Sequence, residues 1–139
     1  MTTEIRNFKI SDYSSAFTLW RSLPGIALSG ADSEDAIRIF LEKNLTTCFV
    51  AEENGILVGT VLGGSDSRRG YIYHLAVHND YQGKGLGRRL TEVCLIALKS
   101  LGIQKCHIFV INDNLDGQNF WNGLGWVKRE DILVMSKDI

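Results

Sequence analysis

Glycines alternate with other residues in the segment QGKGLGRR, Gln82–Arg89, which joins a predicted strand to the longest predicted helix. The first N–H groups of a helix have no partner inside it, and the helix dipole adds partial positive charge there. Glycine lets a ligand approach the bare backbone, and Lys84, Arg88 and Arg89 add full charges. We therefore predict that this turn binds an anion such as a phosphate or pyrophosphate.

Two common phosphate-binding motifs do not fit the turn. The fingerprint GxGxxG needs a third glycine, but that position is Arg88 counted from Gly83 and Leu90 counted from Gly85. A Walker loop needs Ser or Thr after Gly-Lys, whereas Gly85 follows Lys84. The alternative in which the glycines only form a tight turn would need one glycine, so we favour the anion site.

The turn resembles the (Gln/Arg)-x-x-Gly-x-(Gly/Ala) motif of the GNAT superfamily of acetyl-coenzyme A-dependent N-acetyltransferases. A second stretch, Asn114 followed by Phe120-Trp121 and by Leu124-Gly125-Trp126, is similar to the family's next signature. The order of predicted elements also fits. The resemblance thus covers residues 1–139 as a single N-acetyltransferase domain, and the chain is most similar to small stand-alone bacterial members of the YpeA type.

The resemblance implies that acetyl-CoA is the co-substrate. In the family, the amides of the turn hold the coenzyme pyrophosphate, and the preceding strand pairs with the pantetheine arm and polarises the thioester carbonyl. The implied coenzyme-binding residues are Leu75, Ala76, Val77, Gln82, Gly83, Lys84, Gly85, Leu86, Gly87, Arg88 and Asn114. The implied chemistry is direct attack by a neutral amine in a ternary complex.

The chain departs from the family's proton-transfer groups. Many members carry a tyrosine as general acid where this chain has Trp121, whose indole N–H is a hydrogen-bond donor only. Some members use a glutamate as base where this chain has Phe109. General acid–base assistance is worth roughly 10²–10⁴-fold, so its loss slows such a reaction without abolishing it. The base and acid are left unassigned.

The strand before the turn holds the replacement candidates. Its period of two places Tyr71 and Tyr73 on the face of Leu75 and Val77, with His74 on the other face. Tyr73 is a weak catalytic candidate, because cross-strand packing is the simpler role for either tyrosine. Two acidic residues at the end of an earlier strand, Glu52 and Glu53, are expected in solvent.

We predict an α/β (α+β) fold with a mixed, mostly antiparallel central sheet of six to seven strands flanked by about four helices. Ser11 and Asp32 are the expected N-caps of the first two helices, and Gly102 ends the third. The predicted strands are Ile5–Lys9, Cys48–Glu53, Leu57–Gly63, Gly70–Val77, Lys105–Ile111 and Ile132–Lys137. The predicted helices begin at Ser11, Asp32, Leu86 and Asn114.

Composition argues against several classes of protein. The 139 residues carry a formal charge of −1 and are 45% hydrophobic, which gives no reason to expect nucleic-acid or membrane binding. No apolar run has bilayer length, and Met1–Lys9 has no signal-peptide core. The odd number of cysteines, three, indicates reduced thiols and a cytoplasmic protein. His74 and His78 would lie about 13 Å apart on a strand, so no metal site is predicted.

The sequence leaves the acceptor open. A small-molecule or peptide amine fits the resemblance, and a homodimer is one assembly common in the family. The alternative from another class is a coenzyme-binding module with little or no transferase activity, motivated by Trp121 and Phe109. A third, weaker hypothesis places another anion, such as a nucleotide, in the glycine turn.

Overall fold

A computed structural model describes residues 3–139, and Met1 and Thr2, part of the segment tested for a signal peptide, lie outside the described residues. The described chain divides into two compact units, residues 3–109 and residues 110–139, which are treated separately below. The prediction of a single domain over residues 1–139 stays a prediction.

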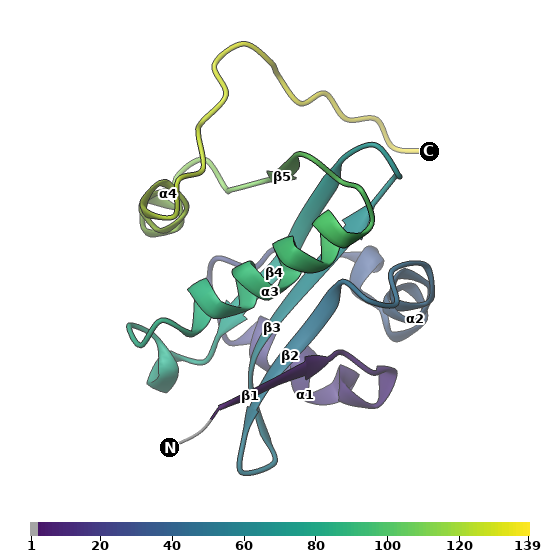
Figure 1. The fold of residues 1–139 in the computed structure, drawn as a ribbon, viewed down its shortest axis with the longest axis vertical. Coiled ribbons are helices and arrows are strands. Elements are labelled where there is room, and N and C mark those ends of the chain that lie inside the picture. The colour runs from purple at the N-terminus through teal and green to yellow at the C-terminus, as the bar shows by residue number, and fades with distance from the viewer. Residues whose placement is uncertain (1–2) are drawn as a thin grey trace. The chain divides into compact units, whose positions relative to one another are not determined.

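The first unit is built on a five-stranded sheet in the order β1-β2-β3-β4-β5 (Figure 1). Its strands are Glu4–Asn7 (β1), Cys48–Glu53 (β2), Ile56–Ser65 (β3), Gly70–Val77 (β4) and Cys106–Ile108 (β5). All neighbours pair antiparallel except β4 and β5, which are parallel. The predicted mixed, mostly antiparallel sheet is confirmed. The predicted count of six to seven strands is wrong, since Ile132–Lys137 forms no strand in the structure.

Three helices cover the sheet, α1 (Tyr13–Arg21) and α2 (Glu34–Lys43) on one face and α3 (Leu86–Ser100) on the other (Figure 1). Two adjacent glycines of β3 show the layers. A Cβ built on Gly63 would meet Cys94 of α3 at 2.5 Å, and one on Gly64 would meet Phe40 of α2 at 2.7 Å. Glycine at both positions therefore lets helices pack closely on both faces.

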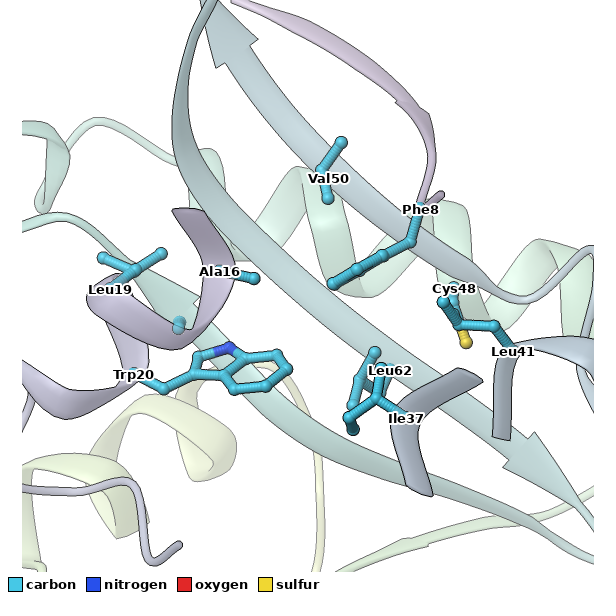
Figure 2. Packing of buried hydrophobic residues seen from close by; sticks show 10 residues of the cluster. Phe8, Ala16, Leu19, Trp20, Ile37, Leu41, Cys48, Val50 and Leu62 are labelled. Carbon is cyan, nitrogen blue, oxygen red and sulfur yellow. The ribbon is translucent and has the colours of Figure 1, made fainter. Parts of the chain in front are cut away.

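The main core cluster lies on the α1/α2 face. Figure 2 shows side chains of α1, α2, β2 and β3 converging there, with the fully buried ring of Trp20 from α1 among them. Burying such a ring contributes about 1.5–3 kcal/mol to folding. This face therefore fixes α1 and the segment between α1 and α2 against the sheet.

Both predicted N-caps are displaced by one residue. A 3-10 helix, Ile10–Asp12, precedes α1, so Asp12 rather than Ser11 stands at its N-cap position. Ser33, not Asp32, caps α2 by accepting a hydrogen bond from the N–H of Ala36 at 3.2 Å. Asp32 instead closes a 3-10 helix, Gly30–Asp32, where its carboxylate accepts from the N–H of Ser29 at 2.9 Å.

The second unit, residues 110–139, contains α4 (Leu115–Gly123). Its N-cap is Asn114, whose side-chain oxygen accepts from the N–H of Gly117 at 2.9 Å. Gly125, at φ +91°, follows the helix in the left-handed conformation that favours glycine. With α1, α2 and α3, this helix confirms the expected total of about four.

Candidate coenzyme site

One edge of β4 is left open over its second half. Within the described residues, β5 pairs with β4 only from Gly70 to Ile72, so the edge from Tyr73 to Val77 has no strand partner. The N–H of His78 donates to the carbonyl of Val58 in β3 at 2.8 Å. Because strand residues alternate, the backbone groups of Val77 and Leu75 point to the open edge, and those of Ala76 point to β3.

The glycine turn follows at the end of this strand. Gly83 and Gly85 have φ values of +77° and +81°, and a Cβ built on either would meet nothing within 4 Å. Backbone conformation, not packing, therefore requires these two glycines. The open space above them leaves the backbone accessible to a ligand, as the sequence predicts.

The N-terminus of α3 presents free amides. No side chain caps Gly85, and the N–H of Arg89 is the one that bonds to the carbonyl of Gly85, at 3.1 Å. The three preceding helical N–H groups, those of Leu86, Gly87 and Arg88, lie before the first intrahelical bond. Together with the helix dipole they form a site suited to a phosphate group.

The basic residues of the turn differ in what they do. The ammonium of Lys84 lies 5.6 Å above the ring of Tyr81. The guanidinium of Arg89 donates to the carbonyl of Thr3 at 3.3 Å, toward β1. The exposed side chain of Arg88 has no bonded partner within residues 3–139. Arg88 is therefore the cation best able to reach a ligand at the turn.

Two side chains hold the turn in place. Gln82 donates from Nε2 to the carbonyl of Val77 at 2.9 Å, and thereby occupies one acceptor on the open edge of β4. Tyr81 donates its hydroxyl to Glu53 at 2.9 Å, and this hydrogen bond raises the pKa of Tyr81. Glu53 is only 6% exposed, so the expectation that it lies in solvent is wrong. Glu52 bonds to Arg6 at 3.3 Å.

The faces of β4 also differ from the expected alternation. Opposite Val61 of β3, which lies between Thr60 and Leu62, β4 places two residues, His74 and Leu75. This β-bulge coincides with the left-handed backbone of His74, at φ +48°. The bulge turns His74 to the face of Tyr73. Ala76 belongs to the same core cluster as Trp20, so Leu75 and Val77 lie on the α3 face, not with Tyr71 and Tyr73 as predicted.

Aromatic rings line the other side of β4. Tyr73 lies 6.1 Å from the ring of Phe40 and 6.4 Å from that of Phe109, and Tyr71 stacks on Phe109 at 6.3 Å. Burial raises the pKa of Tyr73, so its phenol stays protonated at neutral pH. These contacts give both tyrosines a packing role, and the structure places no ionisable group at position 109.

The remaining predicted residues belong to the second unit. The side chain of Asn114 caps α4, and Trp121 packs edge-on against Trp126 at 4.9 Å. The two residues are described within residues 110–139 alone. Their predicted places, beside the coenzyme and at the position of the family's general acid, stay predictions.

The thiols are poor nucleophiles. Burial raises the pKa of Cys48 to about 12 and that of Cys106 to about 11, and it also raises the pKa of Cys94. The side chains of residues 3–139 form no group of three or more His, Cys, Asp or Glu able to hold a metal ion. No helix in that range is long and apolar enough to cross a membrane.

Comparison with known proteins identifies relatives over most of the chain. The sequence profile of the acetyltransferase (GNAT) family matches residues 13–126. An acetyltransferase of Pectobacterium atrosepticum is 36% identical over 111 residues, which cover 80% of this chain and 78% of the relative.

Two solved structures share the fold. Ard1 from Thermoplasma volcanium superposes with a TM-score of 0.79 at 20% identity, over 91% of this chain and 84% of that chain. AAC(6')-Iy, in complex with the bisubstrate analogue CoA-S-monomethyl-acetylneamine, superposes with a TM-score of 0.80 at 15% identity over 100% of both chains.

Proposed function

Because the chain belongs to the acetyltransferase (GNAT) family, we propose that it moves the acetyl group of acetyl-CoA to an amine by direct attack in a ternary complex. The observation that carries the proposal is the continuity of the open β4 edge with the uncapped N-terminus of α3. The acceptor is a small-molecule or peptide amine.

The coenzyme would lie along two segments of this site. Leu75 and Val77 have backbone groups on the open edge, so they would pair with the pantetheine arm. Ala76, whose backbone groups point to β3, would contribute only contact. The amides of residues 83–88 would hold the pyrophosphate, and Arg88 would add a charge. Bound there, acetyl-CoA supplies the activated acyl group.

Direct attack is supported by the chemistry of the described side chains. A covalent acetyl-enzyme needs an activated nucleophile, but burial raises the pKa of all three thiols. The fold neighbour AAC(6')-Iy was solved with an analogue that joins CoA to an acetylated neamine, described as bisubstrate. A molecule of that kind corresponds to both substrates bound at once.

Reduced thiols also support the predicted cytoplasmic location, since Cys48, Cys94 and Cys106 are all free. Membership of the YpeA-like group and the homodimer stay predictions.

The coenzyme site is tested by thermal-shift titration with acetyl-CoA, CoA, ATP and NADH side by side. A ligand at a hundred times its dissociation constant adds about 2.7 kcal/mol of stability, which shifts the Tm of a domain this size by several degrees. We expect a shift with the two coenzymes alone. A larger shift with ATP would favour a nucleotide site, and no shift with any of the four would contradict the proposal.

Transfer is tested by thiol release from acetyl-CoA with four amines: spermidine, alaninamide, neamine and a tetrapeptide with a free N-terminus. Product masses identify the acetylated nitrogen. The competing hypothesis, a coenzyme-binding module, rests on Phe109 and Trp121 in place of ionisable groups. Coenzyme binding without acetylation of any of the four amines would favour that module.

A further inference from the structure

A histidine and an aspartate form an almost buried pair on the α1/α2 face of the sheet. Nε2 of His74 lies 2.6 Å from Oδ1 of Asp32, and the two side chains are only 13% and 10% exposed. The other carboxylate oxygen of Asp32 accepts from the N–H of Ser29. The pair joins residues 42 positions apart, on β4 and on the 3-10 helix before α2.

The surroundings fix the imidazole. The ring of Trp20 packs on that of His74 with 4.6 Å between centroids. Trp20 donates its Nε1–H to Thr60 at 2.9 Å, and Thr60 donates its hydroxyl to the carbonyl of His74 at 2.8 Å. The left-handed backbone at His74 is costly for a side chain with a Cβ and is held by these contacts. The ring is therefore oriented before any substrate binds.

One ring nitrogen faces solvent. Within the described residues, Nε2 is the only ring atom of His74 with a hydrogen-bond partner. Every buried side-chain nitrogen and oxygen there has a partner. Nδ1 has none, so it is accessible to solvent. Since a carboxylate only accepts, Nε2 carries the proton in the neutral ring, and Nδ1 keeps its lone pair.

This nitrogen lies where β4 leaves its neighbour. Pairing with β5 ends at Ile72, and His74 comes directly before Leu75, which begins the stretch proposed to pair with the pantetheine arm. The coenzyme's turn belongs to α3, on one face of the sheet. The side chain of His74 is turned to the other face, so an amine arriving from the α1/α2 side would meet Nδ1 beside the thioester.

We propose that His74 is the general base of the acetyl transfer and that Asp32 is its positioning residue; this inference rests on the proposed function. Nδ1 of His74 takes a proton from the ammonium of the acceptor. The amine lone pair then forms the N–C bond to the acetyl carbon, and the C–S bond breaks with its electron pair on sulfur. The thiolate and the proton leave as CoA thiol.

No other described side chain near the bulge is equally placed. Tyr73, on the same strand, keeps its phenolic proton because burial raises its pKa. Tyr13 of α1 donates its hydroxyl to the backbone carbonyl of Asp32 at 2.6 Å, and the carboxylate of Glu34 in α2 acts on it through space. Besides Asp32, these are the titratable groups that face the pair.

The test compares His74→Gln and Asp32→Asn with Tyr13→Phe, which removes a bond to Asp32 but leaves the pair intact. kcat/KM is measured against pH for the fastest of the four amines and for hydroxylamine, which is largely uncharged at pH 7. For the charged amine at pH 7, we expect His74→Gln to lower kcat/KM by roughly 10²–10⁴-fold.

The charge of the acceptor separates a base from a structural residue. With hydroxylamine we expect a loss of His74→Gln under about tenfold, since no proton must leave before attack. The loss with the charged amine should shrink as pH rises toward the pKa of that amine. Asp32→Asn should lower kcat more than it raises KM, and Tyr13→Phe should keep the pH profile of the wild type. Equal losses with both acceptors, or no loss, would overturn the assignment.

Nitrogen-15 NMR of the wild type provides a test that needs no variant to fold. We expect a proton on Nε2 of His74 and titration of Nδ1 at the pH of the acidic limb of kcat/KM. A proton on Nδ1 in the neutral ring, or a titration away from that limb, would overturn the proposal. A wild type that binds acetyl-CoA but acetylates no amine would overturn this inference together with the proposed transfer, whereas activity retained in His74→Gln would overturn the inference alone.

Discussion

The side-chain amide of Gln82 donates to the carbonyl oxygen of Val77 at 2.9 Å. This hydrogen bond ties the end of β4 to the glycine turn, so the two segments proposed to hold the coenzyme are fixed to each other. Free N–H groups remain on either side of it, at Val77 and at the start of α3. The turn is therefore where substitutions should separate binding from folding.

Replacing Gly85 with valine should abolish coenzyme binding while the fold survives. At φ +81° a side chain with a Cβ is strained, which lowers the free energy of unfolding by about 1–2 kcal/mol. The strain would also shift the amides of the turn. Gly102→Val is the matched control, because Gly102 has φ +87° and equally open space at the other end of α3. Calorimetric titration with acetyl-CoA should show binding in the control alone; binding by both variants would contradict the assigned site.

Replacing Arg88 with alanine should weaken acetyl-CoA about fivefold, the equivalent of about 1 kcal/mol for one exposed charge near a phosphate. The difference should shrink in high salt, because salt screens exposed charges. Arg89→Ala serves as the control, since that guanidinium bonds to the carbonyl of Thr3. If both alanine variants weakened binding equally, the charge at position 88 would have no special role.

The pair of Arg6 and Asp12 should govern part of the acid stability. Two hydrogen bonds of 2.8 Å join them. Burial of Asp12 alone would raise its pKa, but the hydrogen bonds from Arg6 and Lys9 outweigh it and hold the pKa below the usual 3.8. A lowered folded pKa gives stability that is present above about pH 4 and lost as pH falls through the folded value.

Asp12→Asn should therefore lower the free energy of unfolding by about 1–2 kcal/mol at pH 7. Its stability curve should meet that of the wild type at roughly pH 2–3, where the carboxyl is protonated in both folded and unfolded chains. Asp35→Asn is the control, since Asp35 bonds to Arg38 with 89% of its side chain exposed. Urea titrations from pH 2 to pH 8 measure both; parallel curves for Asp12→Asn and the wild type would refute the linkage.

No acetyl-cysteine enzyme should form during turnover. With a pKa of about 11, Cys106 is almost entirely thiol at neutral pH, and the more deeply buried Cys48 is raised to about 12. Intact-mass spectrometry after mixing with acetyl-CoA should show the unmodified chain, and Cys106→Ala should keep most of the activity. An acetyl adduct that disappears on addition of an amine would instead establish a covalent route.

The sequence determined the features that depend on neighbouring residues. The alternating glycines specify an uncapped helix start because only they tolerate left-handed backbone at Gly83 and Gly85. The Asn-Gly dipeptide and the flanking apolar runs predicted the β2–β3 hairpin, and helical periodicity predicted α3. Gly70–Val77 was predicted with the bounds that β4 has. These are local signals, which a single chain carries in full.

Only the tertiary structure decided what joins distant residues. Asp32 and His74 lie 42 positions apart, and the bulge that turns His74 to the face of Tyr73 depends on the register of β3 against β4. A strand period of two has no means of revealing an extra residue, so the sequence placed His74 on the wrong face. Burial of Glu53 beside Tyr81 escaped prediction for the same reason, because a partner 28 residues away reaches it only in the folded chain. Local periodicity sets the elements, and long-range packing sets which side chains meet.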